Sequence, residues 1–444
     1  MNAARGLLDR VVREIGVDPL AVAEAPDPGR PIPLPSRLSV GDLAWACVTA
    51  VRLAAGLSAE HAPDPRRIAV AYRSDHALRL DGKAPRTWSS SSGFWRAADG
   101  WVRTHGNYPH HAEALQDALG LDPADEAAEF ERLRAVIGGR SVHDLVASVS
   151  ACGGLLVPVR PEDPPADRAW RRTPLVASSR AHLLPVLPSA SPRSPGAPLA
   201  GVRVLDLTRV IAGPVCTRTL ALLGADVLRI DPPHRPELPW QHLDTGHGKR
   251  SAVLDATSAR MRELVAGADV VVLGYRPASL ARRGLSPEML TAEHPRLIVA
   301  QLSAWGEDAP ERAGFDSLVQ AESGIAMVEA DGAGTPGALP AQALDHSAGY
   351  LLAAAITAAV RHRDADGGGA VVRTSLRRVA AELLGMPRRD EPGDPAPDEP
   401  GHTQEFTVGG HRLVTAAPVL RGLSFAPPRP WGADPADWEA PAAS

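Results

Sequence analysis

The residues best placed to bind a ligand lie in a turn between a strand and a helix, within residues 201–233. An apolar strand ends at Asp206, and Gly213-Pro214 then opens a helix, since proline suits a first helical turn. A second strand follows around Val227 and Leu228. Ligands on such βαβ units bind at the carboxyl ends of the strands, where this turn lies. The turn lacks the G-x-G-x-x-G pattern, so a dinucleotide site is only weakly indicated.

The composition indicates a globular protein and argues against several classes of function. The chain has 444 residues, 44% hydrophobic and 22% charged, which suits two or three domains. A formal net charge of -5 argues against sequence-independent binding of nucleic acid, which needs clustered positive charge. The 3 cysteines are too few and too scattered for a disulfide framework or a zinc site, so we expect a reducing cytoplasm and no metal. No apolar run is long enough to cross a membrane, so none is expected as a partner.

Changes in composition along the chain predict its domains. Residues 185–199, dense in proline and serine, are the clearest linker. Residues 1–184 before it are predicted to form a smaller α+β domain, which includes a strand at Ile68 to Arg73. Residues 387–444 are predicted to be a loop and a C-terminal return segment that is partly disordered, with a hairpin around Gly409-Gly410.

Strands and helices alternate through residues 200–386. Val270 to Leu273 is fully apolar, as a strand buried in a parallel sheet should be. A strong helix pattern, rich in Ala, Leu and Ile, runs from His346 to Arg361. This alternation predicts an α/β fold with a doubly wound parallel sheet, preceded by the smaller α+β domain.

Several short motifs in the second half share the order and spacing seen in one enzyme family. They are Ala212-Gly213-Pro214, Leu223 to Val227, Asp231-Pro232-Pro233, Gly248 to Ser251, Asp269 to Pro277, His294 to Leu297, Ser303 to Gly306, and Gly314-Phe315-Asp316 followed by Gln320-Ala321. Together they resemble the class III CoA-transferase family, from Gly201 to about Leu384. The resemblance implies a Rossmann-like catalytic domain that moves CoA between an acyl-CoA and a carboxylic acid, with CoA as substrate and no metal.

The resemblance also implies a nucleophilic aspartate just before a long helix of small residues. The matching position in this chain is Asp345. Its carboxylate would attack the acyl-CoA thioester, and the mixed anhydride would then be converted to an aspartyl-CoA thioester. The alternative is that Asp345 only caps the helix, as aspartate often does. The resemblance favours the catalytic interpretation.

A CoA site is implied around the same turn. Ile211 and Ala212 would face the thiol end of CoA, and Arg282 would meet a phosphate through its planar guanidinium. Phe315 and Asp316 would lie beside the nucleophile. The residues that would border the nucleotide are Leu254, Asp255, Thr257, Gly274, Tyr275 and Arg276. For Arg276 and Arg282 a solvated arginine at a helix end is an equal alternative, and Tyr275 could equally be a packing residue.

The chain departs from the family in two ways. The racemase branch has a histidine directly before the aspartate, where this chain has Phe315, so racemisation by that mechanism is disfavoured. The smaller domain precedes the catalytic domain instead of following it, so the order looks permuted or fused. Members usually form an intertwined homodimer, which we also expect here. A non-catalytic acyl-CoA-binding protein stays open as an alternative, as does, less favoured, a racemase or an unrelated nucleotide-binding α/β protein.

Overall fold

The centre of the protein is a parallel sheet. The computed structural model describes residues 3–27, 29–121, 126–180, 184–186, 194, 196–393 and 401–438. A 7-stranded sheet has the order β5-β11-β10-β9-β6-β7-β8. Its strands are β5 (Ala177–Arg180), β6 (Arg203–Leu207), β7 (Asp226–Asp231), β8 (Lys249–Val253), β9 (Val270–Leu273), β10 (Ile298–Ser303) and β11 (Ala370–Ser375). Every neighbouring pair is parallel except β5 with β11 at one edge. The predicted α/β fold is confirmed.

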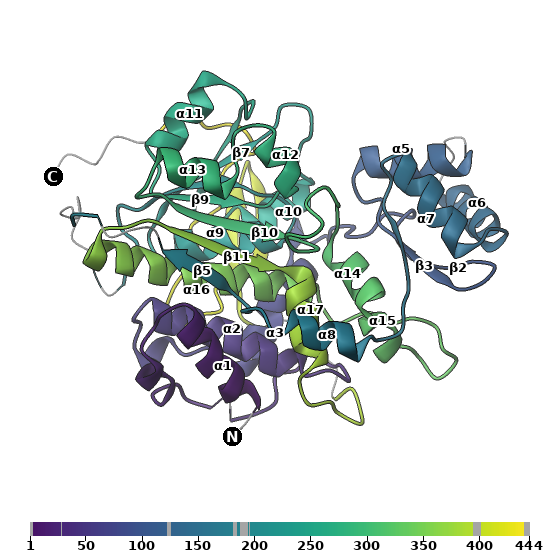
Figure 1. Ribbon diagram of the computed structural model, residues 1–444, viewed down its shortest axis with the longest axis horizontal. Coiled ribbons are helices and arrows are strands. Elements are labelled where there is room, and N and C mark those ends of the chain that lie inside the picture. The colour runs from purple at the N-terminus through teal and green to yellow at the C-terminus, as the bar shows by residue number, and fades with distance from the viewer. Residues whose placement is uncertain are drawn as a thin grey trace.

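Helices cover both faces of this sheet. Alternate side chains of β9 point to opposite faces, so Val270 and Val272 join one apolar cluster while Val271 and Leu273 join another. One face is covered by α9 (Ala212–Leu222) and α16 (Ala343–Asp366) and the other by α11 (Ala259–Ala266), α12 (Pro277–Ala281) and α13 (Pro287–Glu293). Figure 1 shows α11 to α13 above the strands and α16 below them. The sheet is therefore doubly wound, as predicted.

The long helix α16 is the core of one face. It packs between α9 and α2 (Val40–Ala54), and its residues from Ala343 to Val360 are all buried. Among the described helices it alone is long and apolar enough to cross a membrane, yet its most apolar stretch lies wholly inside the protein. Gly349 lets the backbone of α9 approach, because a Cβ there would lie 2.6 Å from the Ala212 carbonyl oxygen. The start of α9 is thus held against the first turns of α16.

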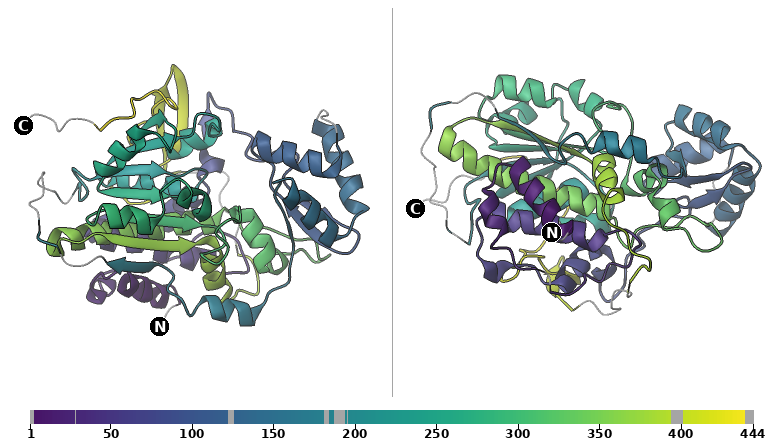
Figure 2. Two further views of the ribbon diagram at one scale, coloured as in Figure 1. Left: turned by 45° about the horizontal axis from the view of Figure 1, so that its top comes forward. Right: turned by 60° about the horizontal axis from the view of Figure 1, so that its bottom comes forward.

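A small domain (residues 94–158) stands beside the sheet domain. It consists of an antiparallel sheet and three helices, namely β2 (Phe94–Arg96), β3 (Trp101–Thr104), β4 (Leu156–Pro158), α5 (Pro109–Leu119), α6 (Glu126–Gly138) and α7 (Val142–Ala151). It has its own apolar cluster around Trp95 and Leu115. Both views of Figure 2 show it projecting from the body of the protein. The predicted α+β unit is present ahead of the parallel sheet.

The packing divides the chain differently from the predicted boundary at residue 184. Helix α1 (Ala3–Glu14) packs on α2, and α2 packs on α16, so the N-terminal region belongs to the sheet domain. Strand β5 also joins the large sheet. The reason is that the largely apolar α2 covers one side of α16, which would otherwise face water, and the amphipathic α1 packs on α2. Parts of the predicted linker, residues 187–193 and 195, lie outside the described residues.

One predicted strand is wrong. Ile68 to Arg73 lies within a helix, α3 (Pro65–Tyr72). Asp64 caps this helix by accepting hydrogen bonds from the backbone N–H groups of Arg66 and Arg67, and a proline at the first position favours it further. The remaining helices are η1 (Pro19–Val22), η2 (Ala59–His61), α4 (Ser74–Ala77), α8 (Pro164–Trp170), α10 (Pro239–Thr245), α14 (Asp316–Ser323), α15 (Ile325–Val328) and α17 (Leu376–Leu384).

The C-terminal segment returns to the sheet domain. The expected hairpin forms from β12 (Thr403–Val408) and β13 (His411–Ala416), and β13 also pairs with β1 (Arg79–Leu80). The expected disorder does not extend over residues 426–438, because Trp431 donates a hydrogen bond to Asp231 and Trp438 packs on the large domain. Residues 394–400 and 439–444 lie outside the described residues.

Substituting Gly349→Ala is expected to destabilise the protein. The new Cβ would clash with the Ala212 carbonyl oxygen at 2.6 Å and push α9 away from α16. Overpacking of this kind costs about 1–3 kcal/mol, to be measured as the free energy of unfolding in urea. The control is Gly138→Ala at the end of α6, whose Cβ has ordinary room and should leave stability nearly unchanged. Equal stability of the two variants would contradict the close approach.

Candidate active site

The turn after β6 is organised by a buried carboxylate. Asp206 accepts hydrogen bonds from the Thr208 backbone N–H at 3.1 Å and from the Thr208 hydroxyl at 2.5 Å. Its second oxygen accepts from the Thr217 hydroxyl at 2.5 Å and from Lys249 Nζ at 3.0 Å. Lys249 also donates to the Pro214 carbonyl at 2.9 Å. One ion pair therefore holds both ends of the turn that precedes α9.

This turn lies at the topological switch point of the sheet. The chain proceeds outward from β6 to β7 and β8 on one side and to β9 and β10 on the other, so ligands are expected outside the ends of β6 and β9. Gly274, directly after β9, is close enough that a Cβ would lie 2.9 Å from Thr208 Cβ. Ile211 and Ala212 lie at this switch point and are both buried. Ile211 and Ala212, predicted to face the thiol end of CoA, thus lie at the position where such folds bind ligands.

The turn contains a strained residue. Val210 has a φ of 73°, a left-handed conformation that is rare for a β-branched side chain. Its N–H donates to Glu237 at 2.9 Å, and Glu237 is itself paired with the buried Arg229 at 2.9 Å. Such strain persists only where the surroundings fix it, and it clusters at functional sites.

Two carboxylates, Asp316 and Asp345, meet at the N-terminus of α16. Asp316 is the first residue of α14, and its Oδ2 accepts the Asp345 backbone N–H at 2.9 Å. Its Oδ1 accepts a short hydrogen bond from the Gln320 side-chain amide, which is oriented by the Leu339 N–H. The N-cap of α16, Gln342, makes no side-chain cap bond, so Asp316 caps this helix from another helix. The side chains are 1% and 6% exposed for Asp316 and Asp345.

The two carboxyl groups have different proton affinities. Burial raises the pKa of Asp316 to about 6, against hydrogen bonds from Asp345, Gln320 and Leu344 that favour its ionised form. Burial and the nearby Asp316 charge raise the pKa of Asp345 well above its ordinary value. No hydrogen bond reaches the Asp345 carboxyl from the part of the chain that the structure describes. The hydrogen-bond donors of the pair therefore converge on Asp316, while burial and mutual repulsion disfavour ionisation of both carboxyl groups at once.

The expected nucleotide-binding residues lie at the same edge of the sheet. Leu254, Asp255 and Thr257 follow β8, and Asp255 accepts both the Thr257 N–H and its hydroxyl at 2.7 Å. Tyr275 follows Gly274, and its buried hydroxyl has no partner among the described residues.

The two arginines of the expected CoA site already have partners on the surface. Arg276 donates to the Glu311 carbonyl at 3.4 Å, and Arg282 forms an exposed ion pair with the Glu311 carboxylate. A phosphate would have to displace Glu311 from Arg282. Exposed pairs of this kind contribute little to stability, so a phosphate could replace Glu311 at low cost.

The small domain contributes residues that sequence reasoning missed. The His105 ring stacks on Phe315 with centroids 4.0 Å apart, directly before Asp316. The Tyr108 hydroxyl donates to Glu237 at 2.5 Å, and the guanidinium of Arg209 lies 4.1 Å from the Tyr108 ring centre. These residues are more than a hundred positions from their partners, and no motif links them. Gln320 belongs to the family-like motif Gln320-Ala321, but the sequence predicted no role for it.

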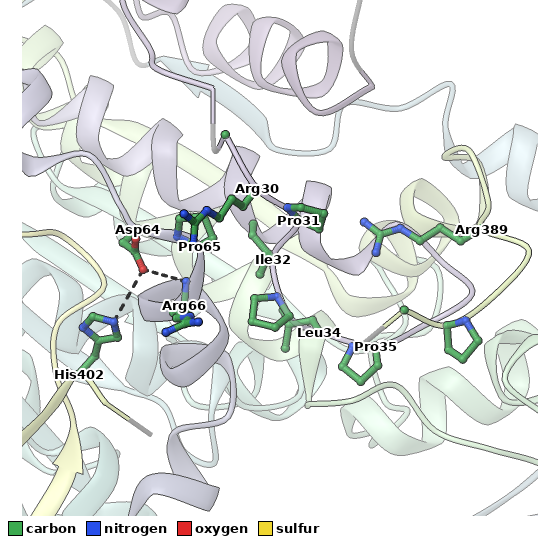
Figure 3. Close-up of a pocket in the computed structure, with 14 residues that line it drawn as sticks. Arg30, Pro31, Ile32, Leu34, Pro35, Asp64, Pro65, Arg66, Arg389 and His402 are labelled. Atoms are coloured by element: carbon green, nitrogen blue, oxygen red, sulfur yellow. Dashed lines mark hydrogen bonds and ion pairs between the residues drawn. The ribbon is translucent and has the colours of Figure 1, made fainter. Parts of the chain in front are cut away.

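A cavity of about 1030 Å³ lies elsewhere on the protein. Figure 3 shows its lining residues, among them Arg30, Arg66 and Arg389, with Asp64 bonded to the Arg66 backbone and paired with His402 at 3.7 Å. None of the expected CoA-site residues lines it. We place the candidate site at the acid pair, since the cavity brings no buried reactive group together. Among the described residues no group of three or more His, Cys, Asp or Glu could hold a metal ion.

Substituting Asp206→Asn is expected to destabilise the protein strongly. It would leave Lys249 buried without its carboxylate, and breaking such a pair costs about 3–5 kcal/mol. The control is Glu405→Gln, which removes one partner of the exposed pair with Arg412 and should leave stability nearly unchanged. Chemical denaturation of both variants measures the difference. A loss below about 1 kcal/mol for Asp206→Asn would show that the buried pair does not organise this turn.

Comparison with known proteins finds a family that matches part of the chain. Residues 199–417 match CoA-transferase family III. The chain is 34% identical over 209 residues to a probable fatty acyl-CoA transferase of Mycobacterium tuberculosis, covering 43% of this chain and 53% of that protein. It is 32% identical to a succinate–glutarate CoA-transferase of Agrobacterium fabrum, covering 42% and 53%.

The chain therefore spans about half the length of the curated relatives it matches. A crystal structure of the mycobacterial protein superposes with a TM-score of 0.40 and 35% identity, over 42% of this chain and 56% of that one. The match to CoA-transferase family III extends over residues 199–417 of this chain.

Proposed function

We propose that the protein is an enzyme that transfers CoA from an acyl-CoA thioester to a carboxylic acid, with Asp316 as the nucleophile. The observation that carries this proposal is the Asp316 carboxylate held at the N-terminus of α16 by the Asp345 N–H, beside the turn at the switch point of the sheet. The match to CoA-transferase family III supports CoA transfer as the class of reaction. The hydrogen bond from the Asp345 N–H supports Asp316 as the nucleophile.

The reaction proceeds by exchange at one carboxylate. Ionised Asp316 attacks the thioester carbonyl, which releases CoA thiolate and leaves a mixed anhydride. The thiolate attacks the aspartyl carbonyl of the anhydride, which releases the first acid and leaves an aspartyl-CoA thioester. An incoming carboxylate attacks that thioester to form a second anhydride and frees the thiolate, which then attacks the new acyl group and restores Asp316. Covalent catalysis divides one difficult exchange into easier steps.

Asp316 suits the nucleophile better than Asp345, the residue expected from the family pattern. A nucleophilic carboxylate must be ionised, and the hydrogen bonds of the pair all favour ionisation of Asp316. The positive end of the α16 dipole favours a negative charge on either carboxyl group, since Asp345 lies in the first turn of this helix. Burial and the Asp316 charge raise the pKa of Asp345, which favours a single negative charge on the buried pair. Asp345 as the nucleophile is the second candidate, and the test below separates the two.

A non-catalytic acyl-CoA-binding protein is the alternative function. The observation in its favour is that Asp316 is 1% exposed beneath the small domain. An acyl-CoA reaches this carboxylate only if the small domain moves away from the turn. For the whole protein, acyl-CoA and carboxylic acid substrates, a homodimer and a cytoplasmic location all stay predictions.

Substituting Asp316→Asn should abolish covalent trapping, whereas Asp345→Asn should retain it. The protein is incubated with acyl-CoA and hydroxylamine, and the modified residue is mapped by mass spectrometry. Because removal of a nucleophile costs about 1,000-fold or more, Asp316→Asn should show no adduct. Asparagine resembles the neutral carboxyl group proposed for residue 345, so that variant should keep the adduct at Asp316.

The opposite pattern would assign the nucleophile to Asp345. CoA binding without any adduct in the unmodified protein, across short, long and dicarboxylic acyl-CoAs, would favour the non-catalytic alternative.

The rate of adduct formation should rise with pH and level off above the pKa of Asp316. Burial raises that pKa to about 6, so below it the carboxyl group is protonated and cannot attack. Single-turnover rates are measured between about pH 4.5 and about pH 8. Their pH profile should follow a single ionisation. Asp345→Asn should leave the midpoint in place, since in the proposed reaction Asp345 stays protonated when Asp316 ionises. A midpoint near the ordinary aspartate value would contradict the burial of Asp316 in the reacting enzyme.

A further inference from the structure

Arg52, near the end of α2, is a buried cation that is only partly bonded. The residue is 3% exposed, and its Nη1 donates to the Leu57 carbonyl at 2.9 Å. Its Nε and Nη2 are buried without a hydrogen-bond partner among the described residues. Burial lowers the pKa of this guanidinium, although the charge of Glu24 opposes the shift. Burying a guanidinium is costly unless an anion accompanies it, so these unbonded N–H groups call for an explanation.

The unbonded groups of Arg52 are joined by a second one on the same face of α2. Nε and Nη2 present their N–H groups side by side, as the fork that matches both oxygens of a carboxylate. Thr49 lies three residues earlier, where a helix brings side chains together, and its buried hydroxyl has no partner among the described residues. A threonine hydroxyl within a helix can donate to the carbonyl four residues back, as Thr357 does to Ala353 at 2.7 Å. The Thr49 hydroxyl is not used in this way.

Thr49 and Arg52 both line a cavity of about 200 Å³, here called the Arg52 cavity. Water occupies about 30 Å³ per molecule in the liquid, so the cavity has room for about six groups of that size. Much of the remaining lining is apolar and consists of Pro26, Ala62, Pro63 and Pro65. The cavity therefore combines one charged fork and one hydroxyl with a short apolar wall.

The other charges of the Arg52 cavity favour an anion with a single charge. Asp27 and Asp64 also line it, together with the exposed Arg421. Both carboxylates already have partners, because Asp27 pairs with Arg5 at 2.7 Å and Asp64 caps α3. They leave the Arg52 fork unbonded, yet their negative charges would repel a phosphate dianion more strongly than a carboxylate.

The Arg52 cavity is separate from the candidate active site. Arg361 donates to the Ala54 carbonyl at 3.0 Å, so the C-terminal ends of α2 and α16 lie side by side. Asp345 lies in the first turn of α16, and a rise of about 1.5 Å per residue places it about 24 Å from Arg361. None of the residues expected to bind CoA lines the cavity.

We propose that the Arg52 cavity binds a small carboxylic acid in its ionised form. The Nε and Nη2 groups of Arg52 hold the two carboxylate oxygens, and the Thr49 hydroxyl donates a third hydrogen bond. The apolar wall surrounds a short hydrocarbon chain, and the bound carboxylate supplies the counter-charge that the guanidinium lacks. This inference does not depend on the proposed function.

The test measures binding of butyrate by isothermal titration calorimetry, with butyramide as the neutral probe of the same shape. The unmodified protein should bind butyrate saturably and butyramide at least about 10-fold more weakly. In Arg52→Met the Kd for butyrate should rise about 10- to 100-fold, as expected for loss of charge-assisted hydrogen bonds. Thr49→Val keeps the shape of the side chain and removes only the hydroxyl, so its Kd should rise about 3- to 10-fold.

Two further variants show that the binding measured is at the Arg52 cavity. Arg52→Lys retains the charge without the planar fork, and its Kd should lie between those of Arg52→Met and the unmodified protein. Arg67→Met is the matched control and should leave the Kd unchanged. Arg67 also donates to a backbone carbonyl, that of Pro418 at 2.7 Å, but it does not line the cavity. Thermal unfolding checks that each variant is folded, and Thr49→Val carries the comparison if Arg52→Met is not.

The outcomes decide both the site and the class of ligand. Butyrate binding that weakens in the two cavity variants and not in Arg67→Met supports the proposal. Equal binding by Arg52→Met and the unmodified protein, or no saturable binding of butyrate, overturns it. Inorganic phosphate is the third probe, and phosphate binding that depends on Arg52 and is tighter than that of butyrate would overturn the assignment to carboxylic acids. None of these results bears on the nucleophile, which the covalent adduct identifies separately.

Discussion

The hydrogen bond from the Asp345 backbone N–H to the Asp316 carboxylate is the contact on which the candidate site depends. It requires the first turn of α16 to meet the first residue of α14, and the position of α16 is fixed by its packing between α2 and α9. The small Gly349 permits that packing, and it brings the turn after β6 against the same helix. A helix end, a capping carboxylate and a ligand-binding turn are thus held together by burial of one long apolar helix.

Charge balance explains why the polar groups of this region are arranged in pairs. Asp206 is matched by Lys249, and Glu237 by Arg229, and all four are buried. The acid pair differs, because Asp316 and Asp345 have no cation within ion-pair distance among the described residues. A single negative charge on the pair and the hydrogen bonds to Asp316 reduce the cost of burying them. Buried charges without full compensation are typical of functional sites, where a substrate completes the balance.

The order of the domains along the chain has little influence on how the site is assembled. The small domain has an apolar core of its own, and it meets the sheet domain through Tyr108 and Glu237 and through the stack of His105 on Phe315. These contacts depend on complementary surfaces and not on which domain is synthesised first. Helix α1 packs on α2, and α2 packs on α16, so neither joins the small domain. The apolar side chains of α16 are in this way kept from water.

Local sequence determined the parallel sheet, the turn before α9 and the helix at α16, because apolar periodicity, proline position and small-residue content act over a few neighbouring residues. It also placed Asp345 next to a helix start. Which of Asp316 and Asp345 receives the hydrogen bonds was decided largely by tertiary structure, since the backbone donors to Asp316 come from Leu344 and Asp345, about thirty positions downstream. The helix α3 and the placing of the N-terminal region on α16 were likewise decided by capping and packing. Arg52 shows the limit most clearly: its neighbours along the chain indicate only an apolar helix, and the packing of residues 26–27, 62–65 and 421 against α2 encloses its guanidinium in a cavity, because burial depends on neighbours in space and not on separation in sequence.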